Sequence, residues 1–328
     1  MENSTKRSRK QYGVQNQKIA VVGSGLMGRG IGQVFATAGF NVTLVDLSQK
    51  VLDSALQQIT TSLNVMKKSG LLAESRDSIL SRVSTNPELS EAVSDASFVV
   101  EAVFEDVEAK KDVFKRVERS TGESTIIASN TTAIPITTLA GVTFHPERIV
   151  GAHFWNPPHL VTAVEVTRGE KTSSETVEKT VSILKKVGKK PAVVNQDIPG
   201  QIGIRILYAM IREATWLVEN KVASAEDIDN IVKEALGGRL EVLGPLELAD
   251  LSGIDLVENV SNILYKSLDT STRAQPLVKQ MVKAGELGVK TGKGFYDWKT
   301  SRNAQDTIKE RDAHLIKILK EQSSQTRY

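Results

Sequence analysis

The stretch Lys18–Ser48, KIAVVGSGLMGRGIGQVFATAGFNVTLVDLS, decides the fold of this protein. It opens with a short β-branched run, Lys18–Val22, and continues over Leu26–Ala38 with apolar residues at helical spacing. A second β-branched run, Asn41–Val45, follows a glycine. A strand, a helix and a strand within about thirty residues form a βαβ unit, which predicts two parallel strands side by side.

The glycines between the first strand and the helix, in GSGLMG, have the form G-x-G-x-x-G. This pattern alone is weak, but here it follows a strand, opens a helix and precedes an acid at the end of the next strand. Gly23 makes the tight turn, Gly25 lets the backbone approach a pyrophosphate, and Gly28 lets the helix pack on the sheet. The expected cofactor contacts are Gly23, Gly25, Leu26, Met27, Gly28 and Asp46.

Strands continue to alternate with helices along the following part of the chain. Two further buried strands are expected in SFVVEAVFED and STIIASNTT, with an amphipathic helix, AKKDVFKRVERS, between them. PAVVN, residues 191–195, is the last credible strand. This alternation predicts a Rossmann-type, doubly wound and mostly parallel sheet over residues 17–196.

Beyond Gln196 the pattern becomes helical. Ile202–Val218 is apolar at helical spacing, and Ser224 is a good N-cap with Asp227 three positions later. Two or three more helices are expected, and no strand is convincing. The fold class is therefore α/β followed by all-α. The expected division is a disordered basic tail over 1–16, the dinucleotide domain over 17–196, a helical dimerisation and substrate domain over 197–300, and a helical tail over 301–328.

Asp46 predicts which dinucleotide is bound. Its carboxylate would accept hydrogen bonds from the ribose 2′-hydroxyl and would repel a 2′-phosphate, so NAD is expected rather than NADP. FAD fits the same glycine pattern, but a helical second domain suits a soluble NAD enzyme better. The alternative is a glycine-rich turn that binds nothing.

Composition narrows the class of protein further. The chain has 328 residues, a net charge of +3 and no cysteine, which excludes disulfides, thiolate chemistry and cysteine-based zinc sites. No apolar run is long enough for a membrane span, and no secretory segment is recognisable. The basic cluster KRSRK is weak support for a nucleic-acid partner and could be a fragment of a transit peptide. We expect a cytoplasmic enzyme, with the mitochondrial matrix as the lesser alternative.

Two ionisable residues stand out in GAHFWNPPHLVTAVEVTRG, which reads as two strands around a Pro-Pro bend. His153 lies in the first strand, and Glu165 lies in an apolar run of the second. An alcohol oxidised by hydride loss must also lose its hydroxyl proton, which a histidine can accept. Glu165 could orient the imidazole and stabilise its charged form. A purely structural His–Glu bond fits the spacing almost as well.

Several motifs together resemble the L-3-hydroxyacyl-CoA dehydrogenase family over roughly Gln17–Trp298. They are GSGLMGRGIGQV, VVEAVFEDVEAKKDVF, ASNTT, HFWNP followed by VEV, DIPG, GPLELADLSGID and KTGKGFYDW. The resemblance implies that His153 is the catalytic base and Glu165 its partner. It also implies a homodimer formed through the helical domain. It places five residues around the nicotinamide half of NAD, namely Glu105, Lys110, Thr132, Asn156 and Lys290. Thr132 and Asn156 are expected among the catalytic residues as well.

The chain departs from the family pattern at positions that touch the substrate. Thr132 replaces a serine and keeps its hydroxyl, whereas Ile204 replaces an asparagine and Gln201 a phenylalanine. If QIGIRIL is helical, Gln201 and Ile204 share a face, and the glutamine amide could replace the missing one. Otherwise Gln201 is solvent-exposed and Ile204 packs the domain interface. Of the family's two coenzyme A contacts, Ser62 matches, but the lysine falls at Ser69, with Lys68 beside it.

These observations favour NAD-dependent oxidation of a 3-hydroxyacyl-CoA, or a related 3-hydroxy acid, to the 3-oxo compound, as in fatty acid metabolism. No metal is expected, since His153 and bound hydroxyls can stabilise the developing alkoxide. A second interpretation is a dehydrogenase of a free small compound such as carnitine, a sugar acid or a heterocyclic hydroxy compound, because GGRLEVLGPLE resembles such relatives. A third is an NAD-binding protein without turnover, which only Ile204 supports.

Overall fold

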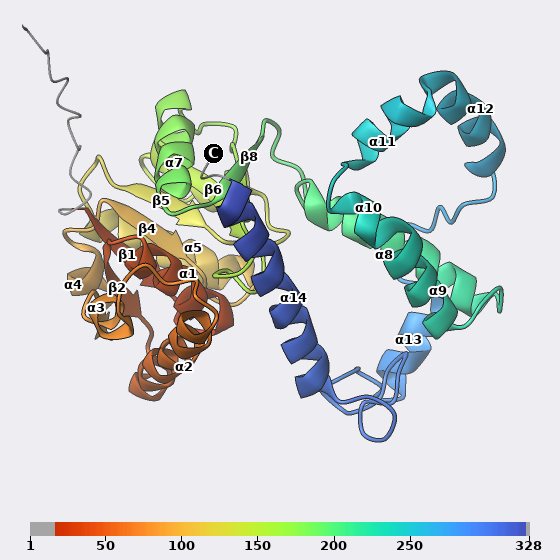
Figure 1. Cartoon of the computed structure of the whole chain (residues 1–328). Helices are drawn as coiled ribbons and strands as arrows, with labels where there is room; N and C mark the ends of the chain where they lie inside the picture. The colour runs from red at the N-terminus through yellow and green to blue at the C-terminus, as the bar shows by residue number, and fades with distance from the viewer. Residues whose placement is uncertain (1–16, 326–328) are drawn as a thin grey trace, which may run out of the picture. The chain divides into compact units, whose positions relative to one another are not determined.

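The computed structural model describes residues 17–325, so the expected basic tail over 1–16 lies outside the described residues. The chain divides into two compact units (Figure 1). The first contains the residues up to Ile202 together with those from Asp312 onward, and the second is Gly203–Arg311. The division thus falls after Ile202 rather than at Gln196, and the last helix contributes to both units.

In the described part of the first unit, eight strands form one sheet in the order β3-β2-β1-β4-β5-β6-β7-β8. All neighbouring pairs are parallel except β6 and β7, which are antiparallel. The α/β class and the mostly parallel sheet predicted from the sequence are therefore confirmed. The strands are β1 Lys18–Val22, β2 Asn41–Val45, β3 Val83–Asn86, β4 Phe98–Glu101, β5 Ile126–Ser129, β6 Ile149–Phe154, β7 Ala163–Thr167 and β8 Lys190–Val194.

Helices cover both faces of this sheet. Alternate residues of β1 enter two different cores, Ile19 and Val21 one of them and Ala20 and Val22 the other. The first core also contains side chains of α1, α2, α3 and α7, and the second contains side chains of α4, α5 and α6. These helices are α1 Leu26–Thr37, α2 Gln49–Lys68, α3 Arg76–Leu80, α4 Leu89–Val93, α5 Val107–Ser120, α6 Ile136–Ala140 and α7 Ser174–Lys186, with a 3₁₀ turn η2 at Pro146–Arg148.

The edge strand β3 was missing from the sequence-based expectation. Its sequence, VSTN, has one large apolar residue and no alternation, because it pairs with β2 alone and none of its residues is fully buried. The strand expected third along the chain, in SFVVEAVFED, is consequently the fourth, β4.

The second unit is helical, as expected. Its helices are α8 Gly203–Glu219, α9 Ala225–Ile231, the π-helical η3 Val232–Gly237, α10 Gly238–Leu240, α11 Pro245–Ser252, α12 Ile254–Leu264, α13 Pro276–Lys283 and the first part of α14 Ala304–Gln325. The predicted cap forms at α9, where Asp227 N donates to Ser224 Oγ at 3.1 Å. Within Gly203–Arg311 the only strand-like pairings are isolated bridges around Lys293.

No helix within residues 17–325 combines the length and the hydropathy that a bilayer-spanning segment requires.

Candidate active site

The glycine loop shows which glycines the fold itself requires. Gly23 has φ +93°, and a Cβ there would lie 2.7 Å from the backbone of Ala102. A Cβ on Gly28 would lie 1.7 Å from the carbonyl oxygen of Gly23. A Cβ on Gly25, by contrast, would meet no atom within 4 Å. Gly25 therefore leaves open space at the N-terminus of α1, where a pyrophosphate could approach the backbone.

Asp46 follows β2 directly, as the sequence predicts. Its Oδ2 accepts a hydrogen bond from Ser24 N at 3.0 Å, and its Oδ1 accepts one from Ser48 N at 3.3 Å. The carboxylate borders a pocket of about 550 Å³. The pocket lining includes Gly23, Gly25, Asp46, Leu47, Phe104 and Arg116. These residues fit a dinucleotide bound with its adenosine end beside β2. Of the other expected contacts, Leu26 is exposed and Met27 packs partly against the core.

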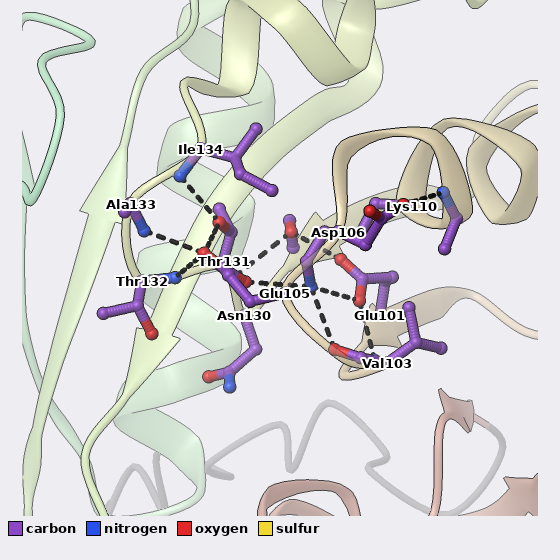
Figure 2. Close-up of polar contacts among 12 residues, drawn as sticks. Glu101, Val103, Glu105, Asp106, Lys110, Asn130, Thr131, Thr132, Ala133 and Ile134 are labelled. Atoms are coloured by element: carbon purple, nitrogen blue, oxygen red, sulfur yellow. Dashed lines mark hydrogen bonds and ion pairs between the residues drawn. The ribbon is translucent and has the colours of Figure 1, made fainter. Parts of the chain in front are cut away.

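A cluster of charged side chains lies at the carboxyl ends of β4 and β5 (Figure 2). Lys110, on α5, forms ion pairs with Glu101 at 2.7 Å and with Glu105 at 3.4 Å. Glu101 and Lys110 are fully buried, whereas the Glu105 side chain is 39% exposed. Glu101 was not among the expected site residues. An acid inside the apolar run FVVEAV was the available signal, the same kind of signal that singled out Glu165.

Glu105 holds the turn that carries Thr132 (Figure 2). Its Oε1 accepts hydrogen bonds from Thr131 Oγ1 at 2.6 Å and from the backbone N–H groups of Thr132 and Ala133, both at 2.9 Å. Burial raises the pKa of Glu105, but these hydrogen bonds and the charge of Lys110 outweigh it and lower that pKa below its usual value. Glu105 is therefore ionised at neutral pH.

The remaining residues expected near the nicotinamide differ in their surroundings. Thr132 is half-buried, and Asn156 is exposed in the bend after β6. Lys290 belongs to the second unit.

The antiparallel pairing of β6 and β7 places His153 directly opposite Glu165. His153 Nδ1 lies 2.8 Å from Glu165 Oε2, and both side chains are 6% exposed. An ionised carboxylate can only accept, so this bond places the proton on Nδ1 and leaves Nε2 as the basic nitrogen. The structure thus brings together the pair that the sequence singled out.

The expectation for Gln201 and Ile204 was wrong in its geometry. Gln201 has φ +51° and lies in a turn before α8, which begins at Gly203, so the two residues do not share a helix face. The alternative of an exposed Gln201 is also wrong, because this side chain is 5% exposed. Its Nε2 donates to the carbonyl oxygen of Thr131 at 3.2 Å. Ile204 is half-buried and belongs to the second unit.

The turn around Gln201 also reaches the His–Glu pair. Ile202 N donates to Glu165 Oε1 at 2.8 Å, so the two carboxylate oxygens of Glu165 have different partners. Asp197, earlier in the same segment, accepts from the N–H groups of Ile136 and Thr137 at the start of α6. These bonds explain why the first unit extends to Ile202. Backbone donors carry no sequence signal, so this contact could not be predicted.

Lys189 is a second residue near the bend that the sequence did not indicate. Its ammonium is buried and donates to the carbonyl oxygens of Pro158 and Val161. Burial lowers the pKa of Lys189 to about 8. Lys189 therefore fixes the backbone of the bend that carries Asn156.

The two residues considered for coenzyme A lie on α2. Ser62 Oγ is buried and has no hydrogen-bond partner within residues 17–325, whereas Lys68 is exposed at the end of the helix. The described residues contain no group of three or more metal-ligating side chains.

Comparison with protein families matches almost the whole described chain. Residues 18–198 match the NAD-binding domain of 3-hydroxyacyl-CoA dehydrogenase, and residues 200–298 match the C-terminal domain of the same enzyme. The chain belongs to the 3-hydroxyacyl-CoA dehydrogenase family. It is accordingly an NAD-dependent oxidoreductase that acts on CH–OH groups, and the family resemblance seen in its motifs is confirmed.

Individual relatives differ in the substrate that they are named for. A probable 3-hydroxybutyryl-CoA dehydrogenase of Bacillus subtilis is 39% identical over 86% of this chain and 97% of its own. A 5-formyl-3-hydroxy-2-methylpyridine 4-carboxylate 5-dehydrogenase of Mesorhizobium japonicum is 35% identical over 85% of this chain and 90% of its own.

Solved structures show the same two kinds of relative. The crystal structure of a 5-formyl-3-hydroxy-2-methylpyridine 4-carboxylic acid 5-dehydrogenase, described as an NAD⁺-dependent dismutase, has a TM-score of 0.86, 33% identity and coverage of 92% of this chain and 97% of its own. The (S)-3-hydroxybutyryl-CoA dehydrogenase of Ralstonia eutropha has a TM-score of 0.72 and 36% identity, covering 86% of this chain and 98% of its own.

The choice between NAD and NADP is expected to depend on Asp46. In Asp46→Ser the negative charge that would repel a 2′-phosphate is absent, so preference should move toward NADP by roughly tenfold or more. The measurement is the ratio of kcat/KM values for the two cofactors. An unchanged ratio would mean that Asp46 does not contact the ribose.

Proposed function

We propose that this protein oxidises a 3-hydroxyacyl-CoA, or a related 3-hydroxy acid, to the 3-oxo compound, with His153 as the general base and Glu165 as its partner. The observation that carries the proposal is the buried hydrogen bond of 2.8 Å between His153 Nδ1 and Glu165 Oε2. A buried acid and a buried histidine in one domain with a dinucleotide loop form the unit that alcohol oxidation requires.

The roles of the residues follow from this hydrogen bond. NAD, when bound, supplies the acceptor for the hydride that leaves the carbinol carbon. His153 Nε2 takes the hydroxyl proton, because Nδ1 already carries the proton donated to Glu165. Glu165 stabilises the imidazolium that forms, and the Ile202 N–H holds the other oxygen of this carboxylate in place. Thr132 offers a hydroxyl near the substrate, from the turn that Glu105 orders.

The second candidate is a dehydrogenase of a free small compound, with a heterocyclic ring as the specific case. The relative of highest TM-score quoted above acts on a pyridine carboxylate, and its structure is matched over 97% of its length. The buried Oε1 of Gln201 has no hydrogen-bond partner within the described residues, and this observation does not distinguish the two candidates.

One assay separates these candidates. Reduction of NAD is followed by absorbance with purified protein and a panel of 3-hydroxyacyl-CoA thioesters, free 3-hydroxy acids and hydroxymethyl or formyl pyridine carboxylates. The proposal expects the highest kcat/KM for a 3-hydroxyacyl compound. A preference for the pyridine compounds would support the second candidate. Binding of NAD without turnover of any compound would support an NAD-binding protein that has lost activity.

We also propose that the protein forms a homodimer through its helical unit. No apolar side chain of Gly203–Arg311 is among the buried residues of the described chain, whereas large apolar side chains of α11 and α12 are exposed. Leu246, Leu251 and Ile263 are each more than two thirds exposed. Apolar surface of this kind marks an interface between proteins.

Charged substitutions on this apolar surface should separate the subunits. The double variant Leu251→Lys/Ile263→Lys is expected to be monomeric, because each lysine would have to leave water at the interface. Analytical ultracentrifugation measures the mass. Phe144→Lys, which changes an exposed apolar residue of the first unit, is the matched control and should stay dimeric. A dimeric double variant would place the interface elsewhere.

A further inference from the structure

The ammonium of Lys110 lies among three acceptors of the protein, two of them at hydrogen-bond distance and the third, Glu105, in an ion pair. An ammonium carries three N–H donors. Those of Lys110 face Glu101 Oε1 at 2.7 Å, the Val103 carbonyl oxygen at 3.1 Å and Glu105 Oε2 at 3.4 Å. The side chain is 1% exposed. Lys110 is therefore enclosed by the cluster and holds Glu101 and Glu105 beside it (Figure 2).

Glu101 is the counter-charge of Lys110. Its side chain is 0% exposed, and burial raises its pKa, whereas Lys110, Ser129 and Val103 oppose this rise. Oε1 accepts from the Val103 N–H at 2.8 Å as well as from Lys110, and Oε2 accepts from Ser129 Oγ at 2.6 Å. Contacts that donate to both oxygens suit the ionised carboxylate. Glu101 and Lys110 together form a neutral pair.

Glu105 then carries the net charge of the cluster. Two carboxylates and one ammonium sum to one negative charge, and Glu105 is the exposed member. Its Oε1 is occupied by Thr131, Thr132 and Ala133, and for its Oε2 only the 3.4 Å contact with Lys110 is found within the described residues. The unneutralised negative charge of the cluster therefore lies mainly on Oε2 of Glu105 and acts on the site from there.

The position of this charge relative to NAD follows from the sheet. The backbone of Ala102 and Val103, which follows Glu101, lies against Gly23 of the dinucleotide loop. A dinucleotide crosses the carboxyl ends of the strands at the point where the strand order reverses, between β1 and β4. With the adenosine end beside Asp46, which follows β2, the nicotinamide end lies over β4 and β5. The nicotinamide ring carries a positive charge when oxidised and none when reduced.

We propose that Glu101 is a positioning residue that neutralises Lys110, so that the charge of Glu105 stabilises the oxidised cofactor in preference to the reduced one. Lys110 in turn holds Glu105 beside the pair. The proposal concerns NAD alone and does not depend on the identity of the substrate. It predicts in which direction each substitution in the cluster changes the ratio of the Kd values for NAD⁺ and NADH, and which substitution leaves the ratio unchanged.

Four variants test these signs. Glu105→Gln removes the net charge directly. Glu101→Gln removes it indirectly, because Lys110 then neutralises Glu105. Each should weaken NAD⁺ relative to NADH by about tenfold, the effect of one charge at short range in a partly solvated site. The double variant Glu101→Gln/Lys110→Met removes a neutral pair and should keep the wild-type ratio. Lys111→Met removes the exposed Lys111–Glu108 pair on the same helix and is the matched control.

The measurement is Kd for NAD⁺ and for NADH, by calorimetry and by NADH fluorescence, without any substrate. The double variant keeps the test valid if Glu101→Gln does not fold, since replacing a whole buried ion pair is tolerated better than breaking it. The proposal is overturned if the double variant shifts the ratio as far as Glu101→Gln does, because the shift would then follow from Glu101 itself and not from the unpaired charge of Lys110. It is also overturned if Glu105→Gln leaves the ratio unchanged.

Discussion

His153→Ala is expected to lower kcat by about 10²- to 10⁴-fold, the contribution of general acid–base catalysis, while the Kd for NAD stays within about twofold. The physical reason is that His153 Nε2 is the basic nitrogen left by the hydrogen bond to Glu165. Without it the substrate hydroxyl has no acceptor for its proton. Kinetics with the best substrate of the panel and calorimetric NAD binding provide the two readouts.

Glu165→Gln extends this prediction to the pair. A glutamine keeps the shape of the carboxylate but cannot stabilise the imidazolium, so kcat should also fall. The double variant should be little slower than His153→Ala alone, because residues that act as one unit are not additive. Fully additive losses would show that the two side chains do not work together.

The chain contains a matched control for the His–Glu pair. His145 Nδ1 lies 3.2 Å from Glu147 Oε1, but both side chains are largely exposed. His145→Ala should leave kcat unchanged, since an exposed pair contributes little. If His145→Ala slows the enzyme as much as His153→Ala, the loss has a general structural origin.

Gly25→Asp is expected to weaken NAD binding by about 100-fold without lowering the Tm. The new side chain meets no protein atom within 4 Å, and aspartate is a favourable N-cap for α1. It would, however, occupy the space that the pyrophosphate needs and repel its charge, two costs that add to roughly 3 kcal/mol. Calorimetry measures the Kd, and thermal unfolding measures the Tm.

Substitutions at two other glycines serve as controls for Gly25→Asp. Gly28→Ala should lower the Tm, because its Cβ would lie 1.7 Å from the Gly23 carbonyl oxygen. Gly122→Asp, at an exposed glycine with equally open space, should change neither Tm nor Kd. Unchanged NAD binding by Gly25→Asp would mean that the cofactor does not approach this loop.

Much of the fold could be predicted from local sequence. The β1–α1–β2 unit follows from two short β-branched runs on either side of a segment with helical apolar spacing, and the cap at Ser224 follows from its hydroxyl and from Asp227. The edge strand β3 could not be predicted in the same way, because a strand with a single neighbour needs no apolar alternation.

Sequence identified the site residues that are ionisable but lie within apolar runs, because burying such a side chain without a partner costs free energy. Glu165 in an apolar strand demands a partner, and the hairpin register supplies His153 opposite it. Glu101 satisfies the same criterion, but its partner Lys110 lies on α5, and nothing in the spacing says that the two meet. The roles of these residues in the reaction stay predictions until the variants are measured.

The sequence by itself determined the dinucleotide loop, the strand–helix alternation, the all-helical second unit and the candidate pair, because each depends on neighbours within one or two elements. Only the tertiary structure decided that Gln201 is buried in a left-handed turn, that Ile202 N donates to Glu165, and that Lys110 is enclosed by two carboxylates. The contacts of Gln201 and Ile202 join segments distant in the chain and use backbone groups that every residue type carries, whereas Lys110 meets its carboxylates from the helix that follows them. Whether such a contact forms depends on which segments the sheet brings together, and the local sequence pattern does not encode this.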